Sequence, residues 1–272
     1  MNSDPQSHRV RVLRYGENDG TRADDQLAAE EPLELRVGGA PLTVMMRTPG
    51  RDRELALGFL FGEGMIRERS DVTAIKAIPN GEHADRENIL DLQLAPSAPG
   101  VDARWQRNFL SATSCGLCGV STIEAIHRTA PPLADGSWSV DPDVLYGLDA
   151  KLRAEQAVFA RTGGLHAAGL FTLEGDPVVV REDVGRHNAV DKVVGYALER
   201  GLTPLDRHIL MVSGRTSFEI VQKALQARIP VLVSISAPSS LARDLAQTSN
   251  QTLIGFLRGR QLNVYAGRQR LR

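Results

Sequence analysis

The strongest constraint on the fold is the alternation of short apolar runs with helix-like segments in the second half of this 272-residue chain. The apolar run 209–212 precedes a polar loop and a segment with helical spacing to about Ala227, after which residues 231–235 form another apolar run. Short apolar runs bounded by polar loops are typical of buried parallel strands joined by helices. The sequence therefore predicts an α/β domain.

The rest of this domain is predicted from the same periodicities. The expected elements are a hairpin of strands 169–173 and 177–180, helices at about 189–200 and 240–247, and two late strands at 253–257 and 262–265.

The first part of the chain has a different pattern. Two strand-like segments, 32–37 and 41–47, flank Gly38 and Gly39, and a helix over 52–61 is expected to pack on this hairpin. Residues 1–30 are polar without an apolar period. The predicted parts are a loosely ordered polar tail (1–30), a small N-terminal α+β domain (31–110) and the C-terminal α/β domain (111–272).

Charge and hydropathy limit the kinds of partner that this protein can have. The 32 basic and 33 acidic residues give a formal net charge of −1, so no overall field attracts nucleic acid or an anionic membrane. The N-terminus has no apolar core like that of a signal peptide, and the longest apolar stretch, 55–61, is too short to span a bilayer. We expect a cytoplasmic protein with neither nucleic-acid nor membrane partners.

Only two cysteines occur, Cys115 and Cys118. In a chain without a secretion signal, this spacing favours redox, metal or sulfur chemistry over a disulfide framework. A capping box from Ser121 to Glu124 predicts that the cysteine loop runs into a helix N-terminus, where the dipole favours thiolate. Gly116 gives the loop backbone freedom.

Several chemistries of this pair stay open. The two thiols can pack as small apolar groups. Structural zinc needs four ligands, so the others would have to be histidines or carboxylates from distant positions such as His127, His166 or His187, and we predict no bound metal. Dithiol–disulfide exchange fits the spacing, but no clear buried strand precedes the pair. Sulfur transfer uses the same nucleophilic thiolate.

Three polar, glycine-bearing loops lie before helices of the predicted α/β domain, where ligands of open sheets bind, and the third of them is the glycine turn 162–167 with its single His166. The first consists of Ser213, Gly214, Arg215, Thr216 and Ser217. Thr216 and Glu219 form a potential capping box, and Arg215 is placed to meet a phosphate or diphosphate, although a solvated arginine is the alternative. The second includes Arg181, Asp183, Gly185, Arg186, His187 and Asn188. Asn188 is a plausible N-cap, and this set can grip phosphates and guanine-like edges.

With these residues assembled, the chain resembles the formate dehydrogenase accessory sulfurtransferase family, FdhD. The resemblance rests on segments 32–66, SCGLCG at 114–119, TGGLHAA at 162–168, REDVGRHNAVDKVVG at 181–195, SGRTSFEIVQKA at 213–224 and the tail GFLRGRQLNVY. It implies a C-terminal domain with a cytidine-deaminase-like fold. It also implies a sulfurtransferase that takes sulfur from a cysteine desulfurase as a cysteine persulfide and passes it to the bis-molybdopterin guanine dinucleotide molybdenum cofactor of formate dehydrogenase.

The resemblance also assigns residues. Cys115 corresponds to the persulfide carrier and Cys118 to its partner. The family's cofactor-binding segment matches Phe256, Leu257, Arg258, Gly259, Arg260 and Gln261. Guanine nucleotide binding and a homodimer are further expectations. A chaperone that binds the cofactor without covalent chemistry is the alternative function.

Deamination is disfavoured even if the fold is shared. A zinc deaminase needs a His-x-Glu segment upstream of Pro-Cys-x-x-Cys. No histidine here is followed two residues later by glutamate, and Ser114 stands where the proline would be.

Overall fold

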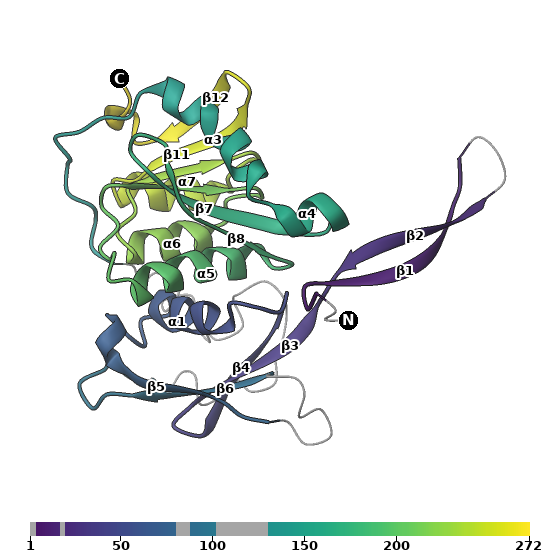
Figure 1. The fold of residues 1–272 in the computed structure, drawn as a ribbon. Helices are drawn as coiled ribbons and strands as arrows, with labels where there is room; N and C mark the ends of the chain where they lie inside the picture. Colours follow the sequence, from purple (N-terminus) through teal and green to yellow (C-terminus); the bar gives the residue numbers. More distant parts are fainter. Residues whose placement is uncertain (1–3, 17–19, 80–87, 102–129) are drawn as a thin grey trace.

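A six-stranded mixed sheet organises the C-terminal part of the computed structural model, which describes residues 4–16, 20–79, 88–101 and 130–272 (Figure 1). Its strand order is β12-β11-β10-β9-β7-β8. The central strands β9 (His208–Val212), β10 (Val231–Ser234) and β11 (Thr252–Arg258) are parallel. Strands β7 (His166–Thr172), β8 (Pro177–Asp183) and β12 (Gln261–Ala266) run antiparallel to their neighbours.

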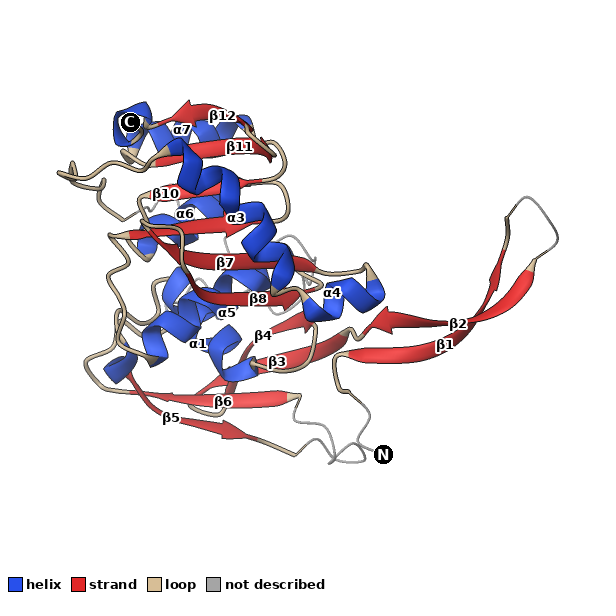
Figure 2. Ribbon diagram, turned by 45° about the horizontal axis from the view of Figure 1, so that its top comes forward, coloured by secondary structure: helices blue, strands red, loops and turns tan. Residues whose placement is uncertain are grey.

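Helices cover both faces of this sheet (Figure 2). Helices α5 (Arg186–Glu199), α6 (Phe218–Gln226) and α7 (Ser240–Thr248) lie on one face, and α3 (Pro142–Ala154) lies on the other. Residues of β9 alternate between the two cores: Leu210 and Val212 belong to one, and Ile209 and Met211 to the other. A strand buried on both faces reads as one continuous apolar run, which is why 209–212 was recognisable in the sequence.

The N-terminal part is a four-stranded sheet of order β4-β3-β6-β5. Its strands are β3 (Glu31–Val37), β4 (Ala40–Arg47), β5 (Val72–Ala77) and β6 (Ile89–Leu94). Helix α1 (Asp52–Gly62) lies between this sheet and α5 (Figure 1). Leu33 and Leu35 of β3 share one apolar core with Leu55 of α1 and Val190 of α5.

The described part of residues 1–30 differs from the prediction of a loosely ordered tail. Strands β1 (Ser7–Arg14) and β2 (Thr21–Ala28) pair antiparallel over their full length and form a ribbon that leads into β3. The ribbon projects from the rest of the molecule (Figure 1). Arginine and valine alternate in residues 9–12, and this period of two was the overlooked signal of a strand.

The predicted fold class is confirmed: the chain is a mixed α/β structure of α+β character. The predicted hairpins, the helix over 52–61 and the late strands are all present. A short helix α4 (Ala157–Thr162) and two 3-10 turns (Arg69–Asp71 and Arg268–Arg270) complete the described elements. Likeness to cytidine deaminases stays a prediction. Across the described ranges, no helix combines the length and apolar character needed to cross a membrane.

Candidate functional site

Three of the predicted polar segments meet at one edge of the six-stranded sheet. Ser213, directly after β9, accepts a hydrogen bond at Oγ from the backbone amide of Ala167 (2.8 Å), and its own amide donates to the Ala167 carbonyl (2.9 Å). Gly214 then lies against the ring of His166 and the side chain of Arg186. The segments 162–168, 181–188 and 213–217 therefore converge, and for 181–188 and 213–217 this agrees with the prediction for loops at the ends of neighbouring strands.

His187 joins the first turns of two helices. This residue follows the start of α5, and its Nε2 lies 3.0 Å from Oγ of Ser217, the N-cap residue of α6. Glu219 Oε2 lies 3.7 Å from the same nitrogen. The N-termini of α5 and α6 are thus held side by side, and their unpaired amides concentrate positive potential at this point.

The two titratable groups with shifted pKa values at this point are Glu219 and His166. Burial opposes ionisation of Glu219, but hydrogen bonds with His187 and Ser217 lower the pKa of its carboxyl to about 2. Burial also lowers the pKa of His166, and the nearby charge of Arg186 lowers it further. At neutral pH the site therefore holds an ionised Glu219 and a neutral His166.

Two arginines and one hydroxyl give this site its capacity for an anion. Arg215 is exposed, whereas Nε of Arg186 is buried. Neither this Nε nor the buried Thr216 Oγ1 has a hydrogen-bond partner among the described residues. Guanidinium groups beside helix N-termini are the usual protein partners of phosphate oxygens. The arrangement can hold a phosphate or another small anion.

Two details of the predicted caps are wrong. Helix α6 begins at Phe218 with Ser217 as its N-cap, so Thr216 and Glu219 form no capping box. Thr216 instead forms an isolated parallel β-bridge with Pro238. Helix α5 begins at Arg186 with Gly185 as N-cap, so Asn188 lies inside its first turn.

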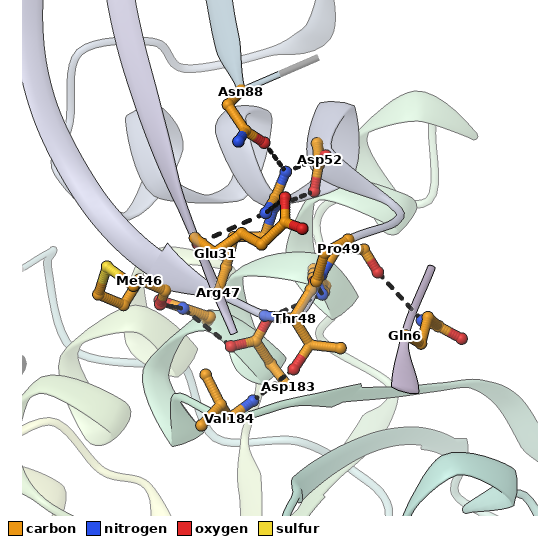
Figure 3. A network of polar contacts seen from close by, with 12 residues as sticks. Gln6, Glu31, Met46, Arg47, Thr48, Pro49, Asp52, Asn88, Asp183 and Val184 are labelled. Carbon is orange, nitrogen blue, oxygen red and sulfur yellow. Dashed lines mark hydrogen bonds and ion pairs between the residues drawn. The ribbon is translucent and has the colours of Figure 1, made fainter. Parts of the chain in front are cut away.

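Asp183 lies at the contact between the two parts of the chain (Figure 3), and the side chains of Arg181 and Asn188 form hydrogen bonds across the same contact. The guanidinium of Arg181 donates to both carboxylate oxygens of Glu54 on α1, at 2.5 and 2.8 Å. The Asn188 side chain donates to the Met46 carbonyl (2.8 Å) and to Asp183 Oδ1 (2.9 Å). The polar groups of these three residues already have partners inside the protein. A role of these residues in ligand binding stays a prediction.

Asp183 is the centre of this contact. Its carboxylate is fully buried and lies 2.7 Å from Nζ of Lys192, which is itself 1% exposed. The Thr48 amide donates to the same carboxylate (3.2 Å), and Lys192 also donates to the Thr48 carbonyl (2.9 Å). Sequence reasoning missed Thr48, Glu54 and Lys192. Lys192 alone left a signal, since it sits among the apolar residues of α5.

The segment 256–261 forms the end of β11 and its turn into β12. Phe256 is exposed with a positive φ of 54°, and the guanidinium of Arg258 lies over its ring. Arg260 pairs with Asp143 of α3 at 2.6 Å. Residues 236–239 lie between this segment and 213–217. The Phe256 amide donates a hydrogen bond to the Ser236 carbonyl, and the Ser239 amide donates one to the Thr216 carbonyl. The convergence of this segment with the other loops is therefore indirect.

Cys115 and Cys118 lie outside the described residues, as does His127. Their predicted roles, and the zinc alternative that depends on them, stay predictions.

Comparison with known proteins places the chain in a family. The sequence model of the FdhD/NarQ family matches residues 28–272. The chain belongs to this family. FdhD/NarQ relatives named "Sulfur carrier protein FdhD" include that of Streptomyces avermitilis, 49% identical over 97% of this chain and 95% of the relative. The relative of the same name from Mycobacterium tuberculosis is 49% identical over 91% and 92%, and that from Thermoplasma volcanium is 41% identical over 97% and 95%.

A solved structure shares the fold. It is described as a candidate formate dehydrogenase accessory protein from Desulfotalea psychrophila and superposes with a TM-score of 0.80 at 24% identity, covering 98% of this chain and all of that one. The three convergent loops lie within the FdhD/NarQ match, whereas the β1–β2 ribbon lies before it except for Ala28.

Proposed function

We propose that this chain is a sulfur carrier that delivers sulfur to the molybdenum cofactor of formate dehydrogenase. The observation that carries the proposal is the 49% identity, over nearly the whole chain, to relatives named as sulfur carriers. The cysteine pair in the sequence supplies a nucleophile suited to this chemistry.

The proposed loading step uses Cys115 as the nucleophile. Its thiolate attacks the outer sulfur of a persulfide on a cysteine desulfurase, so that a new S–S bond forms on Cys115 and the donor's cysteine leaves as thiolate. No electrons are gained or lost overall. The chain then carries one sulfane sulfur as a persulfide, which makes it a sulfurtransferase.

The proposed release step uses Cys118. Its thiolate attacks Sγ of Cys115, the outer sulfur leaves as hydrosulfide, and a disulfide between the two cysteines remains. The two thiols supply the two electrons that convert sulfane sulfur to sulfide, and a cellular dithiol restores the pair. The hydrosulfide becomes a ligand of molybdenum in the bis-molybdopterin guanine dinucleotide cofactor, which is the substrate.

The convergent loops supply the proposed binding surface for this substrate. Arg186 and Arg215, beside the N-termini of α5 and α6, suit its diphosphate groups. The exposed ring of Phe256 and the guanidinium over it suit a flat guanine base. Free guanine nucleotide would use the same groups. We further propose that the protein works in the cytoplasm as a homodimer.

Persulfide mapping tests the proposal. The purified protein is incubated with a cysteine desulfurase and cysteine, and its peptides are then analysed by mass spectrometry without reductant. We expect the mass of one additional sulfur atom on the Cys115 peptide, and none after Cys115→Ala. An unmodified Cys115 in the loaded protein would contradict the proposal.

The same variant separates a carrier from a chaperone that only binds the cofactor. If cells containing only the Cys115→Ala protein still made active formate dehydrogenase, covalent transfer would be excluded and non-covalent delivery would stand. A carrier predicts loss of that activity.

A further inference from the structure

The β1–β2 ribbon is anchored at its base and projects from the rest of the molecule (Figures 1 and 2). At the base, the Ala29 amide donates to the Gln6 carbonyl (2.9 Å), and the Gln6 side chain donates to the Pro49 carbonyl (3.2 Å). Among the described residues, hydrogen bonds and ion pairs farther out join only the ribbon's own two strands. A two-stranded ribbon is marginally stable in water by itself, so a partner that packs on it would stabilise it.

The two faces of the ribbon differ in character. Directly opposed residues share a face, and so do alternate residues along one strand. One face carries valine, alanine and leucine side chains together with His8, Arg14 and Asp25. The outer part of the other face, which we call the arginine face, consists of Arg9, Arg11 and Leu13 of β1 and Arg22, Asp24 and Gln26 of β2.

The arginines of this face have little compensation from carboxylates. Nε of Arg11 lies 3.9 Å from Oδ1 of Asp24, and the two side chains are 86% and 89% exposed, so this pair holds neither side chain firmly. Arg9 and Arg22 are exposed as well, and neither pairs with a carboxylate among the described residues. Three arginines against one aspartate leave a formal charge of +2 on the arginine face.

Two apolar side chains lie at the outer end of the arginine face. Leu13 is 53% exposed and Tyr15 is 75% exposed. Both side chains lie beside Gly20, because a β-carbon on this glycine would be 3.0 Å from Cγ of Leu13 and 3.1 Å from the Tyr15 ring. Tyrosine and arginine are among the residues that most often carry the binding energy of protein–protein contacts. The arginine face therefore combines positive charge with an apolar anchor.

The composition of the ribbon favours a protein partner over a nucleic acid or a membrane. Strands β1 and β2 contain no lysine, and Asp24 and Asp25 lie among the arginines, where they would repel a chain of phosphates. The planar guanidinium of arginine matches a carboxylate with two parallel hydrogen bonds. The formal net charge of −1 provides no long-range attraction to a polyanion.

We propose that the arginine face, together with Tyr15, is a docking surface for an acidic segment of another protein. Carboxylates of that segment pair with the three arginines, and an apolar side chain of the segment packs on Leu13 and Tyr15. The proposal concerns this surface alone and does not depend on sulfur transfer.

Peptide binding tests this surface, with a charge-matched control on the opposite face of the ribbon. Arg14 is exposed and lies 3.9 Å from Asp25, as Arg11 lies 3.9 Å from Asp24. The probe is a fluorescein-labelled peptide of glutamate and leucine, titrated with the full-length chain and followed by fluorescence anisotropy. We expect saturable binding that weakens about tenfold in Arg11→Glu and, independently, in Arg9→Glu, whereas Arg14→Glu stays within about twofold of the unsubstituted protein.

Four results would overturn the docking surface. The first two are absence of saturable binding to the unsubstituted chain and unchanged affinity in both Arg9→Glu and Arg11→Glu. Equal weakening by Arg11→Glu and Arg14→Glu would reduce the effect to net charge. Tighter binding of a single-stranded oligonucleotide of equal charge, or of phosphatidylserine vesicles, would assign the face to a different class of partner.

Circular dichroism separates lost binding from lost folding. No described residue of the ribbon belongs to either apolar core, so all three variants should keep the parent's spectrum. If the spectrum of Arg11→Glu changed, Arg9→Glu would still decide the outcome, because it alters a different position of the same face.

Discussion

Gly58 of α1 lies directly against the backbone carbonyl of Asp191 on α5, so close that a β-carbon at this position would overlap it. The relationship is reciprocal, because Gly195 of α5 meets the carbonyl of Glu54 on α1 in the same way. The two helices therefore cross backbone to backbone. This crossing brings Glu54 to Arg181 and fixes the N-terminal part against the helix that carries His187.

Gly58→Ala and Gly195→Ala should each destabilise the protein by about 3 kcal/mol or more, because the added methyl group forces the two helices apart. Urea unfolding measures the loss. Gly147→Ala is the control: this glycine lies in α3 with open space around its α-carbon, so alanine should stabilise the protein by about 0.5–1 kcal/mol. Equal stability of Gly58→Ala and Gly147→Ala would show that the helices are not in such close contact.

Removing one partner of the buried Asp183–Lys192 pair should have a large effect. Asp183→Asn keeps the shape but leaves the Lys192 ammonium buried without its countercharge, at a cost of about 3–5 kcal/mol of unfolding free energy. Asp176→Asn breaks an exposed pair with Lys151 and should change stability by less than about 1 kcal/mol. Denaturant titration of both variants checks this contrast. Similar small losses in both would remove Asp183 from the centre of the contact.

The carboxyl of Glu219 predicts a specific pH dependence. Its pKa is lowered to about 2 in the folded protein from an ordinary value of 4.5, so the folded state favours the ionised form. Its contribution to stability is complete above about pH 4.5 and disappears as the pH falls to about 2. Glu219→Gln should therefore cost about 1 kcal/mol at pH 6 and progressively less below pH 4.5. Thermal unfolding at a series of pH values would reveal any pH-independent difference, which would contradict this account.

Elements set by local periodicity were predictable, and long-range contacts were not. Strands β9 and β10 and helix α6 were recognisable because each buries a regular run of apolar residues. The start of α5 was placed three residues late because Asn188 has the composition of a cap. In the structure, Asn188 instead donates to Asp183 and to the distant Met46 carbonyl.

The candidate site shows the same contrast between features that local sequence predicts and contacts that it does not. Loop position at the ends of strands predicted that Arg186, His187 and Ser213 would come together, since the carboxyl ends of strands share an edge. It could not show that Arg181 and Asp183, from the same segment, turn toward α1 and Thr48. Thr48 and Lys192 are 144 residues apart in sequence. No local pattern encodes a contact over that separation. Strand β1 was missed for a different reason, because its polar composition outweighed the alternation of arginine and valine in residues 9–12.

Anion binding at the convergent loops should depend on Arg215. Titration calorimetry with guanosine diphosphate at pH 7.5 should show about tenfold weaker binding in Arg215→Ala, corresponding to loss of about 1.4 kcal/mol from one charge-assisted contact. Arg153→Ala is the control, because this exposed arginine lies on α3, across the sheet from the site. The Arg215 effect should shrink as salt is added. Equal affinities of Arg215→Ala and Arg153→Ala would place the anion elsewhere on the molecule.

Lowering the pH should strengthen binding of guanosine diphosphate, because the pKa of His166 lies below its ordinary value of 6.5 and the ring gains its charge only in acid. His166→Gln removes the part of this gain that comes from His166, and it corrects for protonation of the nucleotide itself.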